Sequence, residues 1–384
     1  MKDCVDIFST LEGFQRLVLE DIRRFFGAEI PSHLRKRDFV RRLGSFIIDS
    51  PEVWLRRMLE RDLRLLRHLV QAGPEVPVCL EYPDYPSVLE TVKLIGSDIS
   101  EDCRFLWIPK PLYDVVSPFI ADVIAECESD GTFEMERAAL GYLQFYGVMS
   151  LEEFYDCMLE YWKFSGREDI DLFARTLYDS PIFKIAYVDV EGERYCVSPN
   201  VFNPVEVLDG RNENPSIGMK HFSPVEAVRA GSGSPLFVFG LDTPQGIELV
   251  RTLTSLGYSG DDLVKVEHDI WINSQMIHSD DSTEMIFTAI SSRQDDIPSF
   301  EAYDRCMQVV ADYANSLPKW VLGGHSSLET NRMKVLIQSE EDPFDAMVRD
   351  NPLLGLFVYP VPPDEECPCG SGISYRNCHG KFKS

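Results

Sequence analysis

The residues best suited to chemistry are concentrated between positions 367 and 380, in the stretch CPCGSGISYRNCHG. Three thiols and one imidazole are the donor types that zinc takes at four tetrahedral corners. The first two cysteines stand two residues apart, on either side of a proline that keeps the segment extended, so their side chains project to the same side. The glycines that follow permit a sharp turn that brings the last two donors back to the same point. We therefore predict one zinc ion bound by Cys367, Cys369, Cys378 and His379.

The predicted zinc ion should be structural. Four ligands from the protein close the coordination shell and leave no position for an activated water. A segment this short cannot bury enough apolar surface to fold alone, so we expect folding and metal binding to be a single event. Arg376, Lys381 and Lys383 lie close enough in the sequence to offset the net negative charge of three thiolates around a divalent cation.

This stretch resembles the SEC-C motif, C-P-C-G-S-G-x-x-Y-x-x-C-[CH]-G, and it matches every consensus position. The motif is named for the C-terminus of the preprotein translocase motor ATPase, where the tail recruits an export chaperone, and it is found at the ends of many bacterial proteins. Family members commonly have lysines between the ligands, whereas Ile373, Ser374 and Asn377 stand at those positions in this chain. The resemblance implies a bacterial protein whose zinc knuckle docks a protein partner, without specifying that chaperone.

A second resemblance lies upstream, in the segment WVLGGHSSLE from Trp320 to Glu329. It is similar to the W-x-x-x-G-H-[ST]-P-x-E segment of a set of mostly helical, SEC-C-tailed bacterial proteins of unassigned activity. Ser327 stands where the proline of that segment is expected. We expect the two glycines to end one helix and Ser326 or Ser327 to cap the next. His325 is then a turn residue that satisfies backbone groups and not a catalyst.

The charge of the sequence restricts which partners it can bind. The chain has 384 residues, a formal charge of −26 and a pI near 4.6, which argues against nucleic-acid binding over the whole surface. Residues 1–72 differ, because they hold 14 Lys and Arg against 11 Asp and Glu. The helical spacing places some of these cations on common faces, namely Arg35 with Arg42 and Lys36, and Arg57 with Arg61 and Arg64.

Two interpretations of this N-terminal cluster remain open. The arginines could contact phosphates, which makes a nucleic-acid-associated regulator the alternative function for the chain. They could also form a solvated face paired with neighbouring acids such as Asp38, Glu60 and Asp62. Salt-dependent binding would distinguish the two.

Catalytic and targeting motifs are missing from the sequence. It has no phosphate-binding glycine loop, no G-x-S-x-G, no H-E-x-x-H and no nucleotide fingerprint, and we expect His268 to be structural. A non-enzymatic protein is therefore predicted, with an enzyme of unfamiliar site as a further possibility. With no signal peptide and no span of about 18 apolar residues, we expect a cytoplasmic protein that does not bind membranes. Its scattered cysteines, Cys79, Cys103, Cys127, Cys157, Cys196 and Cys306, should be reduced core residues.

Hydrophobic spacing and capping residues predict a mainly α protein with a small antiparallel β element. A first helix is expected over 5–26, with Gly27 as its end, a second after Ser32, and a third from Ser50. Capping boxes are predicted at Ser87/Glu90, Ser150/Glu153 and Ser223/Glu226. Further helices are expected near 87–95, 111–126, 133–146, 151–164, 168–178, 222–230, 243–257, 260–276, 298–317 and 327–338. A hairpin should join 182–188 to 194–197, and a strand is predicted over 235–239.

Punctuation by proline, glycine and charge divides the sequence into five predicted parts. These are a basic helical cluster (1–74), a helical domain with a β-hairpin (75–210), a helical domain (211–359), a proline-rich acidic linker (360–366) and the zinc knuckle (367–384). Taken together, the patterns favour a zinc-binding, non-enzymatic interaction protein whose knuckle docks a protein partner.

Overall fold

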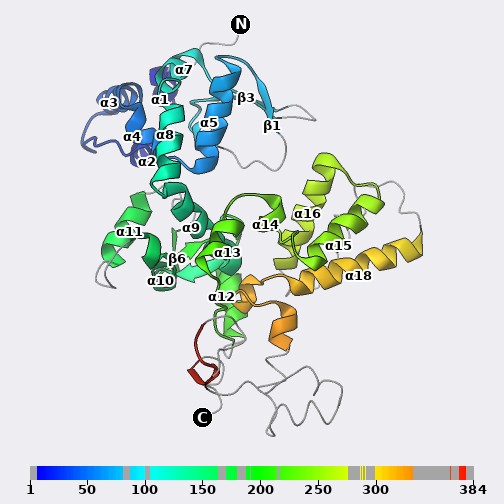
Figure 1. Cartoon of the computed structure of the whole chain (residues 1–384). Coiled ribbons are helices and arrows are strands. Elements are labelled where there is room, and N and C mark those ends of the chain that lie inside the picture. The colour runs from blue at the N-terminus through cyan, green and yellow to red at the C-terminus, as the bar shows by residue number, and fades with distance from the viewer. Residues whose placement is uncertain are drawn as a thin grey trace, which may run out of the picture. The chain divides into compact units, whose positions relative to one another are not determined.

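The computed structural model describes residues 7–80, 87–99, 104–162, 170–179, 187–190, 192–213, 217–275, 299–331 and 372–377, with the single residues 286, 288, 290 and 364. They belong to two compact units. Unit 1 comprises 1–136 and 158–187, and unit 2 comprises 137–157 and 188–384. Helices dominate both, beside two short three-stranded sheets (Figure 1). The predicted fold class is confirmed, while the five-part division stays a prediction. Among the described helices, none combines the length and the apolar character needed to span a bilayer.

Unit 1 begins with five helices: α1 (Ile7–Glu12), α2 (Arg16–Phe26), α3 (Lys36–Asp49), α4 (Pro51–Leu55) and α5 (Glu60–Ala72). The single helix predicted over 5–26 is wrong, because the chain leaves the helical conformation at Gly13, a residue whose freedom makes it a poor helix former. Gly27 ends α2 with φ of 70°, as predicted. A Cβ at this position would also lie 2.7 Å from the end of the Arg57 side chain, which would have to move, so the positive φ is the main reason for glycine here.

A small sheet in unit 1 was not predicted. Its strands are β1 (Val78–Leu80), β2 (Gly96–Ile99) and β3 (Arg104–Trp107), antiparallel in the order β1-β3-β2. Strands of three or four residues are too short to show a clear alternation of polar and apolar residues. Trp107 lies directly on Gly96, where a Cβ would come within 2.1 Å of the indole. The sheet therefore depends on a glycine that gave no strand signal.

The segment between β1 and β2 also differs from expectation. Instead of a helix over 87–95, it holds the short helix α6 (Val88–Thr91). Ser87 accepts a hydrogen bond from the Leu89 N–H at 3.2 Å, but Glu90 forms an ion pair with Arg104 and does not complete the predicted capping box. Arg104 on strand β3 thus binds the Glu90 carboxylate that the predicted cap would have used.

Cys79 corrects the expectation that the scattered cysteines are reduced core residues. It lies exposed on β1 and is disulfide-bonded. The prediction holds for Cys127, Cys196 and Cys306, which are buried free thiols, whereas Cys157 is free and half-buried. Cys103 lies outside the described residues.

The chain continues through α7 (Lys110–Val116), α8 (Ile120–Ser129), α9 (Thr132–Tyr146), α10 (Leu151–Trp162) and α11 (Ile170–Asp179). The helix predicted over 111–126 is two helices, α7 and α8. Pro118 lies at the break, where its missing N–H and its ring oppose a continuous helix. The helices predicted over 133–146, 151–164 and 168–178 are confirmed within a few residues, and Ser150 and Glu153 form the predicted capping box before α10.

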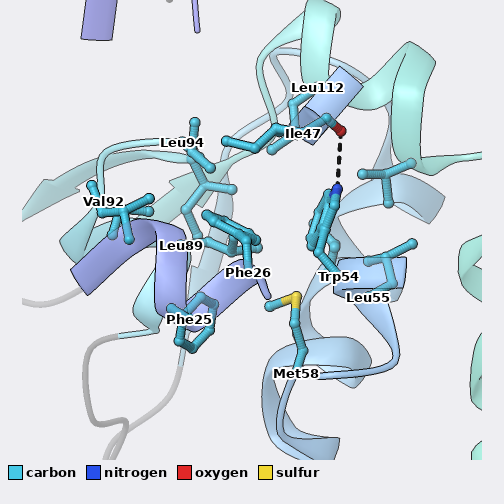
Figure 2. Packing of buried hydrophobic residues seen from close by; sticks show 14 of the residues in the cluster. Phe25, Phe26, Ile47, Trp54, Leu55, Met58, Leu89, Val92, Leu94 and Leu112 are labelled. Atoms are coloured by element: carbon cyan, nitrogen blue, oxygen red, sulfur yellow. Dashed lines mark hydrogen bonds between the residues drawn. The ribbon is translucent and has the colours of Figure 1, made fainter. Parts of the chain in front are cut away.

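One continuous hydrophobic cluster fills unit 1, with Trp54 among its fully buried members (Figure 2). The indole packs edge-on against Phe26, with ring centroids 5.1 Å apart. Its Nε1–H donates to the Ile47 carbonyl at 2.9 Å. Because that polar group is satisfied, the whole side chain can leave water without a desolvation penalty for the N–H.

Unit 2 contains the second sheet, with β4 (Val148–Ser150), β5 (Tyr187–Val190) and β6 (Glu193–Val197) in the order β4-β6-β5. Strands β5 and β6 flank Gly192, whose φ of 88° suits the turn. The predicted hairpin is confirmed over these residues, although 182–186 lie outside the described residues.

Further helices of unit 2 are α12 (Pro204–Asn212), α13 (Pro224–Ala230), α14 (Pro235–Val238), α15 (Pro244–Ser255), α16 (Gly260–Gln275) and α18 (Phe300–Ser316), and the 3₁₀ turn η2 (Trp320–Leu322) follows them. The first four each start with proline, a favoured first helical residue. The strand predicted over 235–239 is wrong, because helix α14 covers Pro235–Val238. The apolar residues of this segment are compatible with either a short strand or a helical turn. Helix α12 was missed. Ser223 and Glu226 form the predicted capping box of α13.

Helices α9 and α13 approach each other closely within unit 2. A Cβ on Gly141 would lie 1.8 Å from the Ala227 carbonyl oxygen, and a Cβ on Gly231 would lie 1.8 Å from the Arg137 carbonyl oxygen. Only glycine fits at both contacts. The hydrophobic cluster of the unit includes Trp271 and Trp320, whose rings meet edge-on at 5.9 Å.

Candidate functional site

The four predicted zinc ligands, Cys367, Cys369, Cys378 and His379, lie outside the described residues. The structure does describe the loop between the two ligand pairs, residues 372–377. Gly372 has φ of 66°, in the left-handed region that the predicted sharp turn requires. The 3₁₀ turn η4 (Tyr375–Asn377) follows and leads directly to the second ligand pair.

Local hydrogen bonds hold this loop together. The Asn377 N–H donates to the Ser374 carbonyl at 2.9 Å, and the Asn377 side-chain amide donates to the Ser374 hydroxyl at 3.0 Å. Ile373 at its tip is 49% exposed. Hydrogen bonds between Ser374 and Asn377 therefore hold the loop from within, while the apolar side chain of Ile373 is exposed to solvent.

Arg376 connects the loop to the preceding acidic linker. Its Nη2 lies 3.0 Å from Oδ1 of Asp364. Both side chains are largely exposed, so the pair is worth only about 0.2–1 kcal/mol. We expected the Arg376 guanidinium to offset negative charge at the metal site. In the structure it forms an ion pair with Asp364 of the linker.

Within the ranges that the structure describes, no group of three or more His, Cys, Asp or Glu side chains is arranged to hold a metal ion. The four predicted donors, between 367 and 379, lie outside those ranges. Three thiols with one imidazole form a donor set of the kind that tetrahedral zinc sites use.

His325 is a turn residue, as predicted. It is fully buried, and its Nε2 lies 3.1 Å from the Gly218 carbonyl oxygen. The next residue caps the following helix: the Ser326 hydroxyl accepts from the Glu329 N–H at 3.2 Å, and the Glu329 carboxylate accepts from the Ser326 N–H at 2.8 Å. Gly323 and Gly324 both have positive φ and end the preceding turn. The two glycines and His325 thus form a turn, and Ser326 with Glu329 forms the cap of the helix that follows it.

His268 lies on α16 and is partly buried, with its Nδ1 3.4 Å from Asp269 Oδ1. Its ring packs against Phe239 and Trp271 in unit 2. These contacts fit the structural role predicted for it.

The predicted arginine stripes separate into two groups in the structure. Arg57 donates to the carbonyls of Phe25 and Arg24, so it caps the end of α2. Arg64 bonds to Glu60 and to Glu128. Arginines of the 57–64 stripe are thus committed to contacts inside unit 1.

The second group is exposed on and just before α3. Its members, which we call the basic face, are Arg35, Arg37, Arg41 and Arg42. Two of them, Arg37 and Arg41, were not in the predicted stripes. Their side chains make no ion pair or hydrogen bond with any described residue, in contrast to Arg57 and Arg64.

Two carboxylates of unit 1, Glu136 and Asp62, are buried. The expectation that Asp62 lies on a solvated face is therefore wrong, and no local pattern marks Glu136 as buried. Glu136 of α9 accepts both of its hydrogen bonds, at 3.1 and 2.9 Å, from the N–H of Glu60, the first residue of α5. Burial raises the pKa of this carboxyl to about 8. Asp62 is also buried and its pKa is raised by desolvation, against the effects of Arg61 and of hydrogen bonds from Ser87 and Val88 at the start of α6. Both acids therefore serve helix N-termini, a role that explains their burial.

Unit 2 contains one buried and one partly buried cation that donate to backbone carbonyls. Lys319 is 1% exposed, and its Nζ donates to the carbonyl of Ser274 in the last turn of α16. Burial lowers the pKa of this amine to about 7. No local sequence pattern predicts this contact, because 45 residues separate the partners.

Arg211 of α12 is the partly buried cation. Its guanidinium donates to the backbone carbonyls of Trp320 at 2.9 Å, Val148 at 2.7 Å and Tyr146. Burial lowers its pKa. One side chain thus joins α12, β4, the end of α9 and η2.

Comparison with known proteins gives one match. The family model of the SEC-C motif matches residues 365–381. No curated protein and no solved structure matches the chain. The matched stretch contains the four predicted donors and the described loop with its left-handed glycine. The chain therefore carries a SEC-C motif, a motif generally of the zinc-binding type, at residues 365–381.

Proposed function

We propose that residues 367–379 form a zinc knuckle, in which Cys367, Cys369, Cys378 and His379 hold one structural zinc ion. The match of the SEC-C model to residues 365–381 is the observation that carries the proposal. The left-handed Gly372 and the turn η4 support it, since they give the loop between the ligand pairs the reversal that four converging donors need. The zinc, when bound, supplies a fixed point that orders a segment too short to fold alone.

The knuckle's role is to dock a protein partner, without catalysis. Four protein donors complete the zinc shell, so the metal has no position for substrate. Residues 367–384 contain three basic and no acidic residues, unlike the rest of the chain. The exposed Ile373 and Arg376 give the loop an apolar and a cationic contact for a partner. The proline-rich linker 360–366 raises the local concentration of such a module near its target.

Affinity capture with matched variants tests this function. Intact chain, a chain without residues 364–384, and the variants Cys378→Ala and Ile373→Glu would each be used as bait. Ile373→Glu leaves all four donors in place and changes only the exposed surface. The matched control, Cys157→Ala, removes a free thiol from the described part of the chain.

We expect specific proteins to be retained by the intact chain and by Cys157→Ala, and to be lost with the deletion, Cys378→Ala and Ile373→Glu. Recovery of the same proteins without residues 364–384 would remove the docking role. Loss with Cys378→Ala but not with Ile373→Glu would keep the knuckle as the docking module and place the contact elsewhere on it.

A further inference from the structure

The basic face of unit 1, formed by Arg35, Arg37, Arg41 and Arg42, has no role in the packing of the unit or in the proposed knuckle. All four side chains are exposed. We propose that this face binds the phosphate backbone of a nucleic acid.

Helix α3 sets the geometry of the face. Its buried residues are Phe39, Val40, Leu43, Gly44 and Ile47, which pack into the unit 1 core. At 3.6 residues per turn, Arg37, Arg41 and Arg42 fall on the opposite side of the helix. Arg37 and Arg41 are four residues apart, about 6 Å along the axis. Arg37 and Arg41 therefore lie along one line of a rigid helix, and Arg42 lies beside them on the same exposed side.

The side chains of the face are available to a ligand. Neighbouring arginines have internal partners: Arg16 bonds to Glu20 and to the Ser32 carbonyl, and Arg57 caps α2. Among the described residues, nothing pairs in this way with the four arginines of the basic face. Residues 30–48 hold five Lys and Arg against the single acid Asp38. The face is thus a local positive patch in a chain of net charge −26.

The composition of the face favours phosphates over a protein surface. The exposed large hydrophobic residues of unit 1 include Leu17, Val18 and Val53, but none of them lies between residues 31 and 49. Protein interfaces need an apolar centre, whereas phosphate contacts need only charge and hydrogen-bond donors. The acidity of the remaining chain would repel a long polyanion, so we expect a short contact of about four phosphates.

Fluorescence anisotropy tests the proposal with the full chain, a labelled 20-base-pair DNA duplex and a labelled 20-nucleotide single-stranded RNA. Titrations would run from about 50 to 300 mM KCl. Four phosphate contacts predict a slope of log affinity against log salt of about −3.6 for the duplex and about −2.8 for the single strand. The variant Arg41→Gln/Arg42→Gln should bring these slopes to about half.

Two further variants show whether the position of the charges matters, as opposed to the net charge of the chain or its folding. Arg229→Gln/Arg251→Gln removes two exposed cations from unit 2, at positions 56% and 70% exposed, and should leave binding unchanged. Asp38→Asn removes the acid on the face and should strengthen binding, a gain that misfolding cannot produce. Thermal melts followed by circular dichroism would confirm that each variant is folded.

The proposal is overturned if neither probe binds at 50 mM KCl, or if Arg41→Gln/Arg42→Gln binds as the unchanged chain does. An equal loss in the unit 2 control would reduce the effect to net charge and also overturn it. Binding of poly-glutamate in place of both nucleic acids would assign the face to an acidic protein partner instead.

Discussion

Buried ionisable side chains stabilise helix ends in both units. Glu136 accepts from the first N–H of α5, and Lys319 donates to the end of α16. Each side chain supplies what its helix terminus lacks, an acceptor for a free N–H or a donor for a free carbonyl. Partners separated by 76 and 45 residues cannot be found from local sequence patterns, which explains why these contacts were missed while local caps such as Ser150 with Glu153 were predicted.

The Glu136 cap predicts a pH dependence. Its folded pKa of about 8 lies above its usual 4.5, so the folded state binds more protons between those values. Glu136 therefore makes its full contribution to stability below about pH 4.5, and part of it is lost as the pH rises through 8, by at most about 1.4 kcal/mol per pH unit. Glu136→Gln, which cannot ionise, should gain stability relative to the unchanged chain over this window.

Urea unfolding from pH 5 to pH 9, followed by tryptophan fluorescence, measures that difference. Glu134→Gln is the matched control, because it lies two residues away on the exposed side of α9. Its difference from the unchanged chain should show little pH dependence. A Glu136→Gln difference that is equally flat would contradict the buried cap.

At the scale of elements, capping residues and hydrophobic spacing predicted most of the helices. They did not predict where long helical segments are interrupted, nor the sheet of unit 1. Capping serines and spacing located α3, α9, α10, α13 and α15 within a few residues. Long-range pairing decided the rest: β1 and β2 exist because β3 lies between them. The run at 235–239 was ambiguous, and proline at its first position favoured a helical turn over the predicted strand.

The α9–α13 crossing predicts that alanine at Gly141 is destabilising. Helix propensity alone would make Gly141→Ala stabilising by about 1 kcal/mol in the interior of α9. The new Cβ would instead lie 1.8 Å from the backbone oxygen of Ala227, which cannot rotate away. We expect a net loss of about 1–3 kcal/mol or more in the free energy of unfolding.

Gly218→Ala is the control for this substitution, because no atom lies within 4 Å of its Cβ position. It should change the free energy of unfolding by less than about 0.5 kcal/mol. A Gly141→Ala chain at least as stable as the unchanged one, in urea unfolding, would show that the two helices do not approach as described.

At the scale of the whole molecule, charge and metal donors are distributed unequally. The chain is acidic overall, the basic face interrupts this on α3, and residues 367–384 contain three cations and no acid. The two compact units are not simple consecutive segments, since their limits at 136/137 and 157/158 lie within α9 and α10. A boundary inside a helix has no proline-rich or polar linker, so composition cannot indicate it. The donors of the predicted metal site, in contrast, lie close together in the sequence, at 367, 369, 378 and 379, so their spacing is a local pattern from which the site can be proposed.

Zinc content measured on purified chain by elemental analysis tests the central claim most directly. We expect one zinc per chain, retained in Cys157→Ala and lost in the single variants Cys367→Ala, Cys369→Ala, Cys378→Ala and His379→Ala. Removal of the metal by a chelator should also leave the unfolding transitions of the two units in place, because the knuckle folds with its metal. A chain with no stoichiometric zinc, or zinc retained by all four variants, would contradict the zinc knuckle.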